Sequence, residues 1–168
     1  MNMKLKTFGV GVLALSLLAL PHASATSSQS AKNITGAQGQ VLKVSKSVVK
    51  NNTKISVTGI GFDESVGIYV GYCVLPKKSE IPSPCGGGIN KKGIGDSSYW
   101  ISSNPPPYGV GLADPFAPGG RFKVSIMLTK KIGAIDCTKV SCAVTVRADH
   151  LRTDDRSFDL FIPITIKK

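Results

Sequence analysis

The sequence has few histidines, few acidic residues and no recognisable set of catalytic side chains. Its 168 residues include 2 His, 1 Trp and 10 acidic residues against 21 basic ones, for a formal net charge of +11. Charged residues make up only 18% of the chain and hydrophobic residues 42%, a mix that can fill a core and argues against disorder throughout. The 18 Gly and 10 Pro follow no period, which excludes a collagen-like chain. The length predicts one domain.

Common catalytic and metal-binding motifs are also missing. The chain has no G-x-S-x-G elbow, no H-E-x-x-H helix motif, no phosphate-binding loop and no C-x-x-C pair. His150 lies in a run of mixed charge, residues 147–156. One interpretation makes it a base oriented by Asp149, or a metal or heme ligand. The other, which we favour, is a solvated loop between two strands. We therefore expect no enzyme activity, no metal and no cofactor.

The N-terminus has the three parts of a secretory signal peptide. Lys4 and Lys6 precede an uncharged apolar run at residues 8–20, and Ala23-Ser24-Ala25 supplies the small-residue exit. The apolar run is shorter than the roughly 20 residues that a transmembrane helix needs, and no later stretch is long enough either. We expect residues 1–25 to be a signal peptide cleaved near Ala25, and the protein to be secreted or associated with the cell surface without a membrane span.

Residues 26–40 are rich in Ser, Gly, Asn, Gln and Ala, which predicts a flexible tether. Beyond it, in residues 41–168, period-two alternation of apolar residues predicts short strands and no segment has a helical stripe. This pattern is typical of an antiparallel sandwich or barrel. Pro163 predicts an edge or a bulge in the last strand. The expected strands are 41–44, 54–58, 66–73, 121–128, 141–147 and 158–166.

Four cysteines follow the signal peptide, and an even number in an exported chain predicts two disulfides. Four cysteines allow three pairings, and the sequence alone does not choose among them. Local pairing, Cys73 with Cys85 and Cys137 with Cys142, is the economical choice. Each such short closure stabilises the folded state by about 2–3 kcal/mol. The bonds would constrain loops without joining two sheets.

A long segment, residues 86–120, carries Tyr99, Trp100, Tyr108 and Phe116 among many Gly and Pro. Loops of this length are uncommon unless they are functional or disordered. Exposed Trp and Tyr favour a binding surface because they bury much area at little entropic cost. The alternative is that Trp100 caps the core while the prolines stiffen its cover.

The basic excess predicts a general attraction to anionic surfaces, wall polymers or nucleic acid. The lysines are dispersed along the chain, and no helix suited to reading bases is present. We expect no specific recognition of nucleic acid.

The run GAIDCTKVSCAVTV, residues 133–146, resembles the corresponding run of the neocarzinostatin family. These are secreted apoproteins that carry an enediyne chromophore. The spacing of Cys73 and Cys85 and the segment ISVTGIGF, residues 55–62, fit the same family, so the resemblance spans most of residues 41–166. Related domains of unknown role occur in actinobacterial surface proteins, and the chain looks closer to those.

The resemblance implies an all-β fold, a seven-stranded antiparallel immunoglobulin-like sandwich with both local disulfides. It also implies a ligand cleft floored in part by the first disulfide, and with it antibiotic and DNA binding. We expect a secreted, monomeric binding module for a small apolar or aromatic ligand. The alternative is an adhesive surface module that binds an anionic wall polymer or a protein through its basic surface. The expected ligand-binding residues are Tyr72, Leu75, Trp100, Tyr108, Phe116, Thr145 and Arg147.

Overall fold

A computed structural model describes residues 31–78, 80–86 and 97–167. The expected signal peptide, the first residues of the expected tether and residues 87–96 of the long segment lie outside the described residues. Within these ranges the regular elements are β-strands and two short 3-10 helices, η1 (Pro107–Gly109) and η2 (His150–Arg152). The predicted all-β fold is therefore confirmed, and the described part contains no helix long and apolar enough to cross a membrane.

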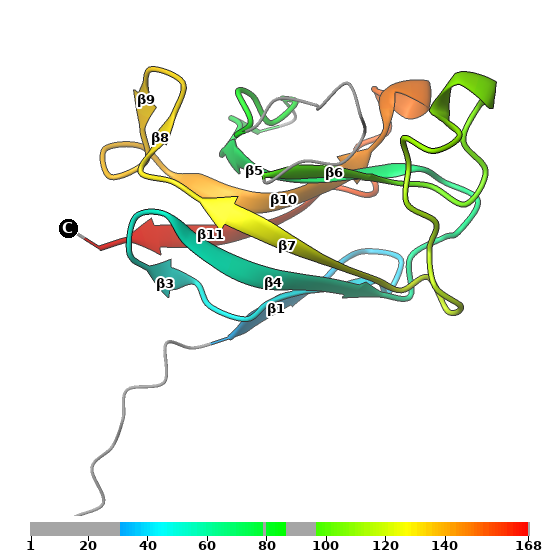
Figure 1. Ribbon diagram of the computed structural model, residues 1–168, viewed down its shortest axis with the longest axis horizontal. Coiled ribbons are helices and arrows are strands. Elements are labelled where there is room, and N and C mark those ends of the chain that lie inside the picture. Colours follow the sequence, from blue (N-terminus) through cyan, green and yellow to red (C-terminus); the bar gives the residue numbers. More distant parts are fainter. Residues whose placement is uncertain (1–30, 79, 87–96, 168) are drawn as a thin grey trace, which may run out of the picture.

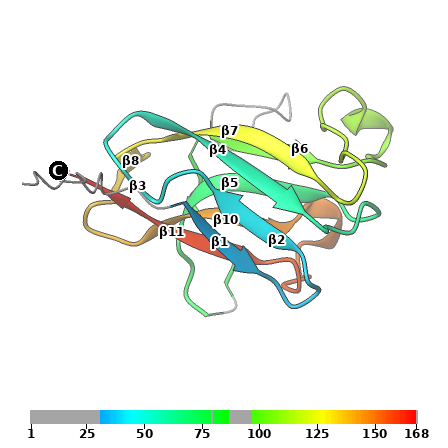
Figure 2. The same cartoon turned by 90° about the horizontal axis from the view of Figure 1, so that it is seen from below.

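Two sheets pack face to face, as Figure 1 shows from the side. Figure 2 looks onto the four-stranded sheet, which has the order β1-β2-β4-β7. The five-stranded sheet has the order β3-β11-β10-β5-β6. The four-stranded sheet comprises β1 (Lys32–Thr35), β2 (Val41–Val44), β4 (Thr53–Ile60) and β7 (Phe122–Leu128). The five-stranded sheet comprises β3 (Val48–Val49), β5 (Ile68–Val74), β6 (Ser98–Ile101), β10 (Cys142–Ala148) and β11 (Leu160–Ile166).

The sandwich has more strands than the seven expected, and one pairing is parallel. Besides the two sheets, β8 (Lys131–Ile132) and β9 (Ile135–Asp136) form a hairpin that projects at the end opposite the 3-10 helices (Figure 1). The short strand β3 runs parallel to the end of β11. Strands of two residues are too short to produce a readable alternation, which is why the sequence did not predict them.

The expected tether contains a strand. Residues 32–35 form β1, which pairs antiparallel with β2 over its whole length. All four residues of β1 are exposed, so the strand has no apolar alternation and its composition resembles a linker. The turn that follows is tied down by the buried side chain of Gln40, whose Oε1 accepts from the amide of Gln38 at 3.0 Å. The ordered sheet thus begins about nine residues earlier than predicted.

The six predicted strands are present. The apolar residues of each alternating pattern face the core between the two sheets, as predicted. Their inward residues are buried, and Val57, Val70, Val144 and Ile162 are at most 2% exposed. Strand β11 is an edge strand along most of its length, because β3 pairs only with its last two residues. This placement accommodates Pro163, which has no N–H to donate.

Side chains also join the two sheets along one edge. The Tyr99 hydroxyl donates to the carbonyl of Ser125 at 2.8 Å, and the Ser97 hydroxyl donates to the carbonyl of Met127 at 3.0 Å. Both acceptors belong to β7, so these bonds satisfy carbonyls that the four-stranded sheet leaves unpaired. Tyr99 and Trp100 lie in strand β6. The sequence predicts a long irregular loop for these residues, and the structure corrects that prediction.

Both predicted disulfides are formed, Cys73–Cys85 and Cys137–Cys142. The first links Cys73, near the end of β5, to Cys85 in the segment that follows the strand. The second links Cys137, just after β9, to Cys142 at the start of β10. Each bond closes a local loop on one sheet, as expected from the short sequence separations of 12 and 5 residues.

Candidate functional site

The candidate cleft lies on the outer face of the five-stranded sheet. Because side chains alternate along a strand, Tyr69, Gly71 and Cys73 of β5 face outward while their neighbours fill the core. The register sets Gly71 between Thr145 of β10 and Ser98 of β6. A residue without a side chain in the middle strand leaves the sheet surface locally uncovered.

A hollow of about 200 Å³ opens above this point. One wall is the Cys73–Cys85 disulfide with Ile81 and Pro82, and the opposite wall is the side chains of Tyr69 and Arg147. A Cβ atom added to Gly71 would meet its nearest neighbours at 3.5–3.7 Å, which is ordinary van der Waals contact. The hollow therefore exists because the position is glycine, and a larger side chain could occupy it without breaking the strand.

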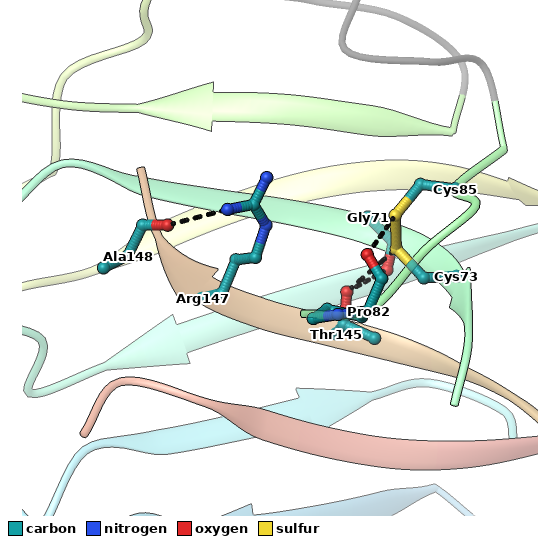
Figure 3. The surroundings of a disulfide bond; sticks show 7 residues. All are labelled: Gly71, Cys73, Pro82, Cys85, Thr145, Arg147 and Ala148. Carbon is teal, nitrogen blue, oxygen red and sulfur yellow. Dashed lines mark hydrogen bonds between the residues drawn. A yellow bond between two sulfur atoms is a disulfide. The ribbon is translucent and has the colours of Figure 1, made fainter. Parts of the chain in front are cut away.

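Thr145 belongs to the floor of this cleft and is almost fully buried. Its hydroxyl lies 3.3 Å from the Gly71 carbonyl and 3.2 Å from Cys73 Sγ (Figure 3). The hydroxyl thus has partners within the protein and links β10 to the disulfide-bearing strand. Its contribution to the cleft is positional: it fixes the floor against which a ligand would pack.

Arg147 supplies the charge at the cleft. Its guanidinium carbon lies 5.1 Å from the centre of the Tyr69 ring, within the range of a cation–π contact, and its Nη1 donates to the Ala148 carbonyl at 3.5 Å (Figure 3). Burial lowers the pKa of Arg147, but an arginine remains cationic at neutral pH. The cleft therefore combines apolar walls with one cation held against an aromatic ring.

Tyr69 connects the cleft to a second cluster, which we call the tyrosine–histidine cluster: Tyr69, Tyr108 and His150. The Tyr69 hydroxyl lies 2.5 Å from His150 Nδ1, and the Tyr108 hydroxyl lies 2.7 Å from Nε2. A neutral imidazole has one donor and one acceptor nitrogen, so one tyrosine donates to the ring and the other accepts from it. Desolvation and the negative charge of Asp149 raise the pKa of Tyr69 to about 12, which keeps the phenol protonated. The cluster attaches η1, which carries Tyr108, to η2 and β5.

Trp100 packs beneath this cluster and is 4% exposed. Its Nε1 donates to Asp149 Oδ2 at 2.9 Å, and Asp149 Oδ1 accepts from the amide of Leu151 at 2.9 Å, which caps η2. The carboxylate of Asp149 is therefore bound to these two donors and does not orient His150 as a base. The favoured interpretation of a solvated loop fits the exposed His150 but not Asp149, which is buried.

The expected ligand-binding residues fall into three groups. Thr145 and Arg147 line the cleft beside the first disulfide. Trp100 and Tyr108 lie in or next to the tyrosine–histidine cluster, behind Tyr69, and do not line the cleft. Leu75, which follows β5, is half-buried and does not line the cleft either.

The third group lies in the core. Phe116 packs with the rings of Phe62 and Phe122, each at a centroid distance of 6.4 Å. Tyr72 is fully buried, since it alternates with the outward Gly71 and Cys73. The same alternation identifies the residues that were missed: Tyr69 and Gly71 occupy the outward positions of β5, opposite the apolar ones that the pattern assigned to the core.

Comparisons with known proteins assign no family. No protein-family description matches the chain, and no curated protein matches it. Among solved structures, macromomycin is similar, with 14% sequence identity and a TM-score of 0.48, over 76% of this chain and 99% of that chain. A likeness of this degree defines neither a family nor a ligand.

Proposed function

We propose that the protein is a secreted, non-enzymatic binding module that holds a small, mostly apolar ligand with an aromatic ring in the cleft beside the Cys73–Cys85 disulfide. The hollow over Gly71 carries the proposal. Pockets for drug-sized ligands occupy roughly 300–1,000 Å³, so a hollow of about 200 Å³ suits one or two rings, or one end of a larger compound such as a chromophore.

The walls indicate how such a ligand would be held. Its ring would lie over Gly71, with one side on Pro82 and the disulfide and the other on Tyr69. Arg147 borders the same hollow and would pair with a carboxylate, phenolate or carbonyl group on the ligand. A rigid strand surface positions all of these contacts, which limits the entropy lost on binding.

Naphthalene-2-carboxylate is a suitable probe, titrated into the purified protein while NMR chemical shifts are followed. We expect shifts at the cleft residues and a dissociation constant that rises at least tenfold in Gly71→Val, which fills the hollow. Ser56→Val is the matched control, because it adds a similar side chain to an outward position of the other sheet. Equal affinity for Gly71→Val and the wild-type protein would refute the cleft as the binding site.

The alternative function is an adhesive module that binds an anionic wall polymer or protein through basic side chains, and the excess of 21 basic over 10 acidic residues favours it. Salt separates the two. Binding through many lysines should weaken steeply between low and high salt, whereas binding in an apolar cleft should change little.

A further inference from the structure

A second hollow lies on the opposite side of the sandwich, on the outer face of the four-stranded sheet. Its volume is about 440 Å³, within the range of small-molecule sites. Strands β2, β4 and β7 form its floor, and the turn at residues 117–121 forms one end. None of the residues that line it is acidic.

The register arranges the outward side chains of this sheet in rows. Lys43 pairs with Thr58, and Thr58 pairs with Lys123, so one row runs cation, hydroxyl, cation across three strands. Neighbouring strands lie about 4.8 Å apart, which puts the two lysines about 10 Å apart at the backbone. Their flexible ammonium groups can converge on one anion above Thr58.

The adjacent row is apolar. Val41 pairs with Ile60, and Ile60 is 52% exposed, an unusual position for a large aliphatic side chain on the solvent face of an antiparallel sheet. Ala117 and Phe122 extend this apolar floor, and Arg121 adds a third cation at its end. The hollow thus has an apolar strip beside a cationic row.

We propose that this hollow binds one amphipathic anion, with its hydrocarbon part on Val41 and Ile60 and its anionic head group between Lys43 and Lys123. Charge complementarity supports this occupant, since three cations and no carboxylate line the hollow. Glu64, whose carboxylate reaches the turn at one end, already accepts from the amides of Gly119 and Gly120 at 2.8 Å. The apolar strip favours an amphiphile over a polar wall polymer, because a polar polymer has no hydrocarbon part to bury the exposed Ile60 side chain. This site is separate from the disulfide cleft.

Decanoate, below its micelle concentration, is the probe, with decanol and decyltrimethylammonium as neutral and cationic comparisons in calorimetry or NMR titration. Decanoate should bind more tightly than decanol, and the cation should bind most weakly. Each of Lys43→Gln and Lys123→Gln should weaken decanoate binding about two- to fivefold and leave decanol binding unchanged. Ile60→Thr, which keeps a β-branched side chain on the strand, should weaken both about fivefold or more.

Lys50→Gln is the matched control, because it removes an exposed lysine from the turn before β4, at the end of that strand opposite Ile60. Three results would overturn the proposal: equal binding of decanoate and decyltrimethylammonium, an equal loss in Lys50→Gln, or chemical-shift changes confined to the disulfide cleft. Vesicles containing phosphatidylglycerol form a further arm. Binding to these vesicles without binding of free decanoate would indicate a membrane-facing surface and would also overturn it.

Discussion

Replacing Tyr72 with phenylalanine should make the protein more stable. The Tyr72 side chain is fully buried, and its hydroxyl has no hydrogen-bond partner within the described residues. Burying a hydroxyl without a partner costs roughly 1–3 kcal/mol. Removing it leaves no other group unpaired, so we expect Tyr72→Phe to raise the free energy of unfolding by about 1 kcal/mol and the melting temperature by about 4 °C.

The gain should grow at alkaline pH. Burial raises the pKa of Tyr72 to about 12, whereas a tyrosine in the unfolded chain titrates near 10. Above pH 10 the unfolded state therefore binds fewer protons than the folded state, and the stability of the wild-type protein falls as pH rises towards 12. Phenylalanine does not titrate. The stability difference should accordingly increase from about 1 kcal/mol at pH 8 to more than 2 kcal/mol at pH 11.

Urea unfolding followed by the fluorescence of the single tryptophan, Trp100, measures both effects. Tyr69, whose pKa is also raised to about 12, is present in both proteins and cancels from the comparison. A Tyr72→Phe variant less stable than the wild type would show that the hydroxyl has a partner and would refute the reasoning. A pH-independent difference would refute the alkaline part alone. Binding of a cleft ligand should be the same in both proteins.

Three further predictions concern the stability of the fold. Trp100→Phe removes a hydrogen bond to the buried carboxylate of Asp149 and should cost about 2 kcal/mol of unfolding free energy, measured by urea titration. Replacing Cys137 and Cys142 with alanine should cost about 2 kcal/mol through loop closure, and more from lost packing, as a calorimetric melting temperature would register. Hydrogen bonds from Thr138 hold the pKa of Asp136 below its usual value. The stabilising effect of the Asp136 carboxylate is therefore lost as pH falls through that lowered pKa. Asp136→Asn should flatten the dependence of stability on pH below pH 4.

Alternation along the strands predicted which residues form the core. It placed Val57, Val70 and Val144 correctly, because burial on one face of a sheet imposes a period of two on any half-buried strand. Strands without that constraint were not predictable. Strand β1 is exposed on every residue, and β6 lies in a segment whose Gly and Pro content is typical of loops.

The candidate cleft was predictable only in part. The cysteine spacing indicated the disulfide, and the resemblance to a known family indicated Thr145 and Arg147 beside it. Nothing local to the sequence indicated that Tyr108 and Tyr69 would hold His150 between them, since these residues are separated by 39 to 81 positions.

The sequence by itself determined the all-β class and the inward face of each long strand, since each depends on residues close together in the chain. It favoured the two local disulfides without fixing the pairing. The tertiary structure decided which residues of different strands are neighbours. Register between distant strands placed Tyr69 between Arg147 and Trp100, and Thr58 between two lysines. Both hollows result from those rows, because a ligand surface on a sheet is built across strands and pairing between strands is set only when the whole sandwich folds.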